Sequence, residues 1–232
     1  MTNKTEQAPA TDVLTTSEAF ITKNKKPIII ISTAIIVLLV GVFCYKYFIG
    51  QPREEKASTA LAMATQYFDQ EIFDKALNGD GSTTTGFARI ASDYSGTDAA
   101  NLANLYAGLC YANLNKWDKA VEYLDNYSTA DDALVSPAAL AALGNAYAHL
   151  NQLDKAVSYL KKAAKKADAE GHNGVNNSLS PVFMLQAAEI VESQGKADEA
   201  LEMYKDIKEK YVASQLVQSQ EIDKYIERAQ DK

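Results

Sequence analysis

Residues 140–163 read LAALGNAYAHLNQLDKAVSYLKKA, and this stretch decides the fold. Apolar residues recur at i, i+3, i+4 and i+7 on both sides of a short polar break, a pattern typical of two amphipathic helices. Gly144 and Ala156 would let the neighbouring helix approach closely, and Tyr147 would fill the volume between the helices. The stretch therefore predicts a pair of closely packed helices.

The same arrangement recurs along the chain. Four short strings share it, FDKAL at 73–77, WDKAV at 117–121, LDKAV at 153–157 and ADEAL at 197–201, and their alanines lie 44, 36 and 44 residues apart. A unit of this period buries its apolar face only by stacking on its neighbours. Function then resides in an extended surface rather than in a catalytic pocket. The residues predicted to form the repeat core are Gly108, Tyr111, Ala120, Gly144, Tyr147, Ala156 and Ala200.

Local signals predict where the helices start and stop. Ser136-Pro137 and Ser180-Pro181 each place a capping serine before a first-turn proline, so each is expected to open the first helix of a unit. Residues 171–178 are rich in Gly and Asn and are expected to form a loop. Residues 214–231 are expected to form a last amphipathic helix that caps the repeats.

An apolar stretch precedes the repeats. Ile28–Phe48 reads IIIISTAIIVLLVGVFCYKYF, which is long enough as a helix to cross about one hydrocarbon core. A cleaved signal peptide is disfavoured because no small-residue cleavage site follows, and a buried core helix is seldom apolar on all faces. The predicted organisation is a disordered cytoplasmic tail at 1–27, a transmembrane helix at 28–48, a linker at 49–56 and a repeat domain at 57–232.

Lysines set the expected orientation of this span. Lys23, Lys25 and Lys26 immediately precede it, which favours an amino terminus in the cytoplasm and a carboxy-terminal domain outside. The predicted location is the inner (cytoplasmic) membrane, single-pass, with the repeat domain in the periplasm.

Composition excludes several classes of function. Residues 57–232 carry 16 Lys and Arg against 25 Asp and Glu, which argues against nucleic-acid binding. The basic cluster at 161–166 is expected to be a solvated helix face. His149 and His172 have no partner at ligand spacing, so no metal site is predicted, and Asp131-Asp132 is expected to be a turn rather than a catalytic pair. We find no cofactor or catalytic motif and predict a protein that is not an enzyme.

The pattern of the units resembles the tetratricopeptide repeat. The best match is the unit with Leu140, Leu143-Gly144, Tyr147, Ala156, Leu160 and Ala163, and the resemblance covers most of residues 57–212. It implies an all-α superhelix of about four helix pairs whose first helices line a partner-binding groove. The positions that the resemblance assigns to the groove are Phe68, Leu105, Leu109, Ala112, Ala141, Asn145, Ala148, Leu185 and Glu189. This groove would be apolar and suited to an apolar helix or an extended segment, although Leu105 and Leu109 could instead pack inside the superhelix.

The layout of tail, single anchor, repeats and cap resembles the YfgM-type ancillary subunits of the SecYEG translocon. Residues 86–97 resemble the short helix and turn that precede a repeat in that family. The resemblance implies protein partners, namely the translocon or periplasmic chaperones and client polypeptides, and a chaperone-like role in translocation or folding. Two alternatives stay open: a scaffold in another envelope assembly or secretion machine, and an enzyme or sensor with an unrecognised site.

Overall fold

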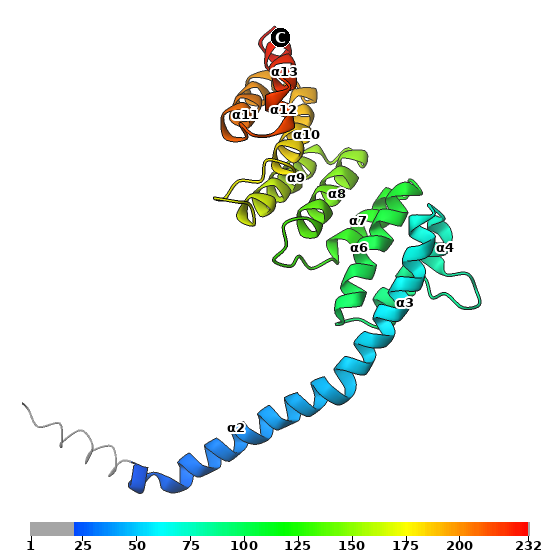
Figure 1. Ribbon diagram of the computed structural model, residues 1–232, viewed down its shortest axis with the longest axis vertical. Coiled ribbons are helices and arrows are strands. Elements are labelled where there is room, and N and C mark those ends of the chain that lie inside the picture. The colour runs from blue at the N-terminus through cyan, green and yellow to red at the C-terminus, as the bar shows by residue number, and fades with distance from the viewer. Residues whose placement is uncertain (1–20, 232) are drawn as a thin grey trace, which may run out of the picture. The chain divides into compact units, whose positions relative to one another are not determined.

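A computed structural model describes residues 21–231 (Figure 1). The described residues are mostly helical and contain no β-strand beyond two isolated bridges, as the sequence predicts. They divide into two compact units, one up to Pro52 and one from Arg53 onward. Residues 1–20 of the expected cytoplasmic tail lie outside the described residues.

The first unit consists of the apolar helix. Helix α2 spans Lys25–Tyr45 and is followed by a π-helical turn, η1, at Lys46–Gly50. No residue of α2 is buried by protein, and its isoleucine, valine and leucine side chains are all exposed. Residues 25–27, expected in the tail, belong to α2, where Pro27 is tolerated in the first turn. Residues 49–56, expected as a linker, are helical as well, because this stretch is rich in good helix formers.

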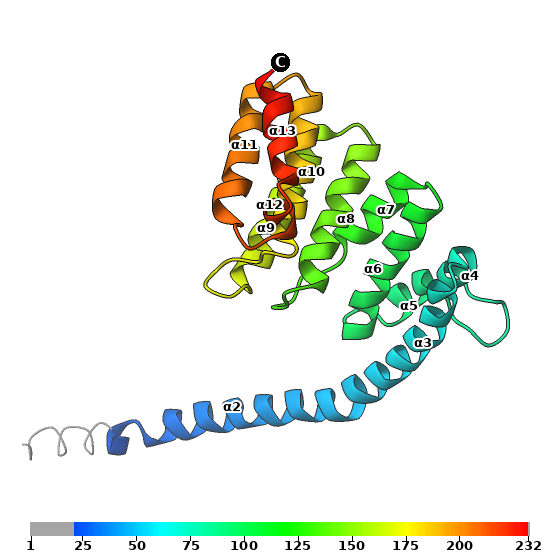
Figure 2. The ribbon, with the colours of Figure 1, turned by 45° about the horizontal axis from the view of Figure 1, so that its top comes forward.

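The second unit is a stack of helix pairs (Figures 1 and 2). We call the first helix of each pair the A helix and the second the B helix. The pairs are α3 (Gln51–Asp69) with α4 (Phe73–Asn78), α6 (Asp98–Asn113) with α7 (Trp117–Asp125), α8 (Val135–His149) with α9 (Leu153–Ala169), and α10 (Ser180–Ser193) with α11 (Ala197–Lys210). A short helix, α5 (Phe87–Asp93), precedes α6, and α12 (Gln215–Gln218) and α13 (Glu221–Gln230) end the chain.

One turn is repeated in all four pairs. The residue two positions after the end of each A helix has a left-handed backbone, with φ of 59° at Glu71, 55° at Asn115, 58° at Asn151 and 78° at Gly195. Its N–H donates to the carbonyl of the residue three positions earlier. The N–H of the following residue donates to the carbonyl five positions before itself, and the two bonds together form a Schellman motif. The four positions are spaced 44, 36 and 44 residues apart, so the turns follow the register of the alanines.

We expect Glu71→Gly to stabilise the protein. Glutamate is the poorest fit of the four residues to a left-handed backbone, and glycine removes that strain, which is worth about 1 kcal/mol. Thermal unfolding of the full-length protein in detergent, followed by circular dichroism, should show a higher midpoint. The matched control is Gly195→Ala. Its new Cβ meets no atom within 4 Å, so only the strain of a left-handed backbone should lower the midpoint. A lower midpoint for Glu71→Gly would contradict this account of the turn.

Close contact between A and B helices explains the glycines of the repeat. A Cβ built on Gly108 would lie 2.5 Å from Cγ of Leu124, and one built on Gly144 would lie 3.0 Å from Cγ of Leu160. Ala120, Ala156 and Ala200 are fully buried on the B helices. The core is divided into three clusters along the stack, each spanning adjacent pairs. A stack of this kind is held together by contacts between neighbours.

The predicted serine caps are wrong. Helix α8 begins before Ser136, and the carboxylate of Asp132 accepts the N–H groups of Leu134, Val135 and Ser136. The Ser136 hydroxyl is buried and donates to Asp132 at 2.5 Å. A carboxylate satisfies several free N–H groups of a first turn at once, so it displaces the serine from the capping role.

The second predicted cap fails in a similar way. The side-chain oxygen of Asn176 accepts the N–H groups of Ser178 and Leu179 ahead of α10. The buried Ser180 hydroxyl donates instead to the carbonyl of Ala164 on α9. Each of these serines thus ties an A helix to the segment that precedes it.

The C-terminal cap is two helices rather than one. Gln220 adopts a left-handed backbone between α12 and α13 and breaks the expected helix over 214–231. Helix α13 packs on α11 and buries Ile222 and Ala229. Its Arg228 binds the buried carboxylate of Glu192 on α10 through Nε at 3.1 Å and Nη2 at 2.5 Å. The hydroxyl of Tyr204 on α11 donates to the same carboxylate at 2.7 Å, so one side chain joins α10, α11 and α13.

Candidate functional site

Charge is divided between the two layers of helices. Three of the four A helices, α6, α8 and α10, contain neither lysine nor arginine and only three acidic residues, Asp98, Glu189 and Glu192. The fourth, α3, carries Arg53 and Lys56 in its first turns. The B helices α9 and α11 are densely charged along their outer sides. We call the surface formed by the solvent-exposed and half-buried residues of the A helices the A-helix face. It is the candidate binding site because it is the less polar of the two layers.

The structure corrects two predicted groove residues. Ala141 is only 4% exposed and packs in a core cluster with Leu160 and Phe183. Leu105 is 7% exposed and packs with Leu124 and Leu143. Neighbouring A helices lie close enough to cover these positions, so they do not line an open groove in the free protein.

The other predicted groove residues remain accessible to different degrees. Glu189 is exposed, whereas Phe68 is half-buried and packs edge-on against Phe73, Phe87 and Tyr106. The remaining five are half-buried on α6, α8 and α10: Leu109, Ala112, Asn145, Ala148 and Leu185.

Sequence reasoning missed the most open part of this face. Leu102, Ala138 and Val182 precede Leu105, Ala141 and Leu185 by three residues, so each lies one turn earlier on the same side of its helix. Ala138 is exposed and Val182 is 44% exposed. Leu134, at the start of α8, is 65% exposed. Extending the helical spacing by one turn toward each amino terminus would have found the three A-helix positions.

The groups weighed for chemistry have structural roles. Asp132 caps α8, and Asp131 pairs with Lys166 at 3.0 Å. The ring of His149 stacks on Trp117 with a centroid distance of 3.7 Å, which joins α7 to the end of α8. Burial raises the pKa of the Cys110 thiol to about 12, so it stays protonated at neutral pH. Among the described residues, no group of His, Cys, Asp and Glu side chains is placed to hold a metal ion.

Comparison with known proteins fits this geometry. Residues 102–129 and 139–173 each match a family model described as tetratricopeptide repeat. These matches cover the two central helix pairs. The fold is a tetratricopeptide-like helical repeat.

Solved structures show the same fold. The chain is similar to crystal structures described as a Podosopora anserina putative kinesin light chain with nearly identical TPR-like repeats, in two forms. Each superposes with a TM-score of 0.52 at 14% sequence identity and covers 77% of this chain, with 94% and 95% of the other chain covered. No curated protein matches the sequence.

Tetratricopeptide repeats bind other proteins, and the fold is typically a scaffold without enzymatic activity. The N-terminal helical segment contains a window that is long and apolar enough to cross a membrane or to act as a signal sequence. The chain therefore combines a protein-interaction repeat with a candidate membrane segment.

Proposed function

We propose that this protein is a membrane-anchored interaction scaffold of the cell envelope. It assists protein translocation or folding outside the cytoplasm by holding apolar segments of client proteins against the A-helix face. The observation that carries the proposal is the segregation of charge, since the A helices α6, α8 and α10 offer apolar and small side chains without a lysine or an arginine. Apolar residues dominate the energy of helix-in-groove interfaces.

The apolar helix supports the anchoring. Helix α2 exposes apolar side chains on every side and buries none of its residues against protein. Exposing such a surface to water is unfavourable by roughly 25 cal/mol for each Å² of apolar area, so a lipid environment suits it. Lys23, Lys25 and Lys26 ahead of the span favour a cytoplasmic amino terminus and a periplasmic repeat domain.

The test of binding uses the full chain in lipid nanodiscs and a fluorescent, uncharged peptide of leucine and alanine as the probe. We expect the peptide to bind, and we expect Ala138→Glu with Val182→Glu to weaken binding at least tenfold, because the peptide would desolvate two carboxylates. Both positions are open to solvent, so the fold should survive. The control is Ser158→Glu, which adds a carboxylate at an exposed position of α9 and should leave binding unchanged.

The location is tested separately. Protease added to spheroplasts should digest the repeat domain and leave the amino-terminal tail protected. Protection of the repeat domain would overturn the periplasmic location, and equal peptide binding by all variants would overturn the A-helix face as the binding site.

A further inference from the structure

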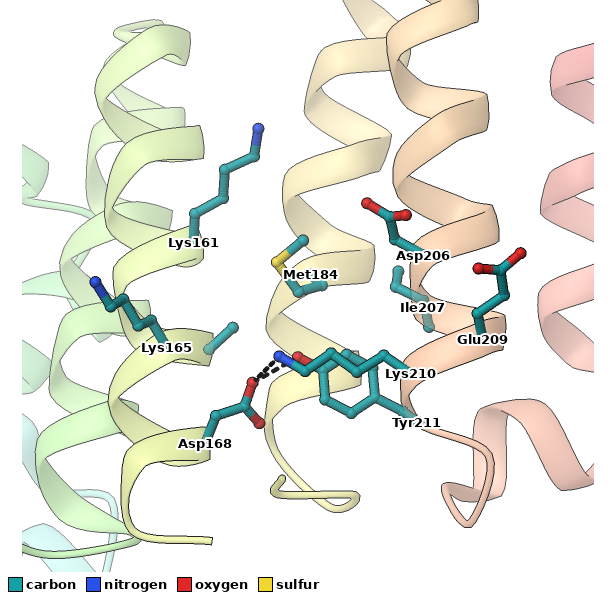
Figure 3. A pocket seen from close by; sticks show the side chains of 10 residues that line it. Lys161, Lys165, Asp168, Met184, Asp206, Ile207, Glu209, Lys210 and Tyr211 are labelled. Carbon is teal, nitrogen blue, oxygen red and sulfur yellow. Dashed lines mark hydrogen bonds and ion pairs between the residues drawn. The ribbon is translucent and has the colours of Figure 1, made fainter. Parts of the chain in front are cut away.

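A concave surface lies on the B-helix layer. Its cavity measures about 490 Å³ and lies between α9 and α11 (Figure 3). The floor is formed by Ala164, Met184 and Ile207, of which Met184 belongs to α10 beneath. We call this surface the B-helix cleft. It takes Met184 from an A helix but includes none of the positions named above for the A-helix face.

The two walls of the cleft carry opposite charge. Lys161 and Lys165 stand on α9, and Asp206 and Glu209 stand on α11, as Figure 3 shows. Lys161 forms a long ion pair with Glu199 on α11, with 3.9 Å between Nζ and Oε1. Among the described residues, Lys165, Asp206 and Glu209 form no ion pair. Lys165, Asp206 and Glu209 are exposed and therefore available to a partner.

One end of the cleft is closed by a fixed contact. Lys210 donates to the carboxylate of Asp168 at 2.6 Å, and the Tyr211 hydroxyl donates to it at 2.8 Å. Burial alone would raise the pKa of Asp168, but these hydrogen bonds and one from the N–H of Asn176 hold it below its usual value. The contact keeps the ends of α9 and α11 together, so the cleft is formed before any partner arrives.

We propose that the B-helix cleft docks an amphipathic helix of a partner protein. The partner's apolar stripe would contact the floor, with carboxylates along the edge facing α9 and amines along the edge facing α11. Two observations select this partner: an apolar floor flanked on both sides by charge, and the placement of α9 and α11 on either side of α10. Helices pack at 8–10 Å, so two helices that flank a third leave a groove suited to one more.

The test uses three synthetic helical peptides that share one leucine stripe. The first has glutamates on one edge of the stripe and lysines on the other, the second has lysines on both edges, and the third has glutamates on both. The full chain in nanodiscs should bind the mixed-edge peptide roughly tenfold more tightly than either of the others, as expected for several exposed charge pairs acting together. A peptide helix that docks in the opposite direction presents its two edges to the opposite walls, so swapping the charges of the peptide would not be a control. The charges are therefore changed on the protein.

The double variant Lys161→Glu with Lys165→Glu makes both walls acidic. It should lose roughly tenfold in affinity for the mixed-edge peptide and come to prefer the peptide with two lysine edges. Both lysines are accessible, and circular dichroism should show unchanged helicity. The A-helix variants Ala138→Glu and Val182→Glu should leave the preference among these three peptides unchanged, because the edge charges are read by the B-helix cleft, so this proposal and the proposed function fail independently.

Three results would overturn the proposal. They are equal binding of the three peptides by the unmodified chain, an unchanged preference in the double variant, and binding of none of them. Self-association that the double variant abolishes, without peptide binding, would assign the cleft to a second copy of this chain instead.

Discussion

Replacing Glu192 by alanine should lower the free energy of unfolding by about 2–4 kcal/mol. The carboxylate of Glu192 holds Tyr204 and Arg228, which belong to two other helices. Without it the hydroxyl of fully buried Tyr204 keeps only a long contact of 3.4 Å to Arg228. The Arg228 side chain is half exposed, so water can solvate its guanidinium in the variant. The loss of stability should therefore be smaller than for breaking a wholly buried ion pair.

Urea unfolding of the full-length protein in detergent would measure this effect. Glu192→Gln keeps the size and one acceptor, and should cost less than the alanine variant. Glu189→Ala removes an exposed carboxylate from the same helix and should change stability by no more than about 0.5 kcal/mol. Equal effects at positions 189 and 192 would show that the buried cluster does not hold the cap.

Gly108→Ala should also be strongly destabilising, by about 1–3 kcal/mol. The new methyl group would lie 2.5 Å from Cγ and 2.9 Å from Cδ2 of Leu124, which is almost fully buried and cannot move aside freely. The gain of about 1 kcal/mol in helix propensity offsets only part of this overlap. Gly144→Ala, at the same place in the next pair, meets Leu160 at 3.0 Å and should cost clearly less.

A double-mutant cycle would identify the cause. Shortening Leu124 to alanine removes the atoms that the new methyl group meets, so the combined loss of Gly108→Ala and Leu124→Ala should be smaller than the two single losses added. Additive losses would mean that the overlap lies elsewhere. Equal costs at Gly108 and Gly144 would contradict the difference in packing between the two pairs.

The fold could be predicted because its main determinants are local and periodic. The spacing of the alanines identifies the register, and the four left-handed turns reproduce it residue for residue. The helix caps could not be predicted in the same way. Asp132 and Asn176 accept N–H groups that precede those a capping Ser136 or Ser180 would serve, and each serine hydroxyl is instead used in contacts with the preceding segment.

The candidate site could be predicted only in part. Helical spacing places Ala141 and Leu105 on the same side of their helices as Ala148 and Leu109, but burial depends on how closely the adjacent A helices approach. The contact of Glu192 with Arg228, 36 residues away, has no signature in the period of the repeat. The lysines at 161–166 were expected to be merely solvated, and only the placement of α11 shows that some of them line a cavity.

Two intervals of the same length between repeat alanines are built from different structural elements. Between Ala76 and Ala120 the additional residues form the excursion that contains α5, whereas between Ala156 and Ala200 they lengthen α9, which has 17 residues against 9 in α7. The added turns supply Lys165 and Asp168, one to a wall and one to the closed end of the B-helix cleft. The greater length of α9 thus lets one helix pair carry charged residues that its neighbour lacks room for, while the turns on either side keep the register of the repeats.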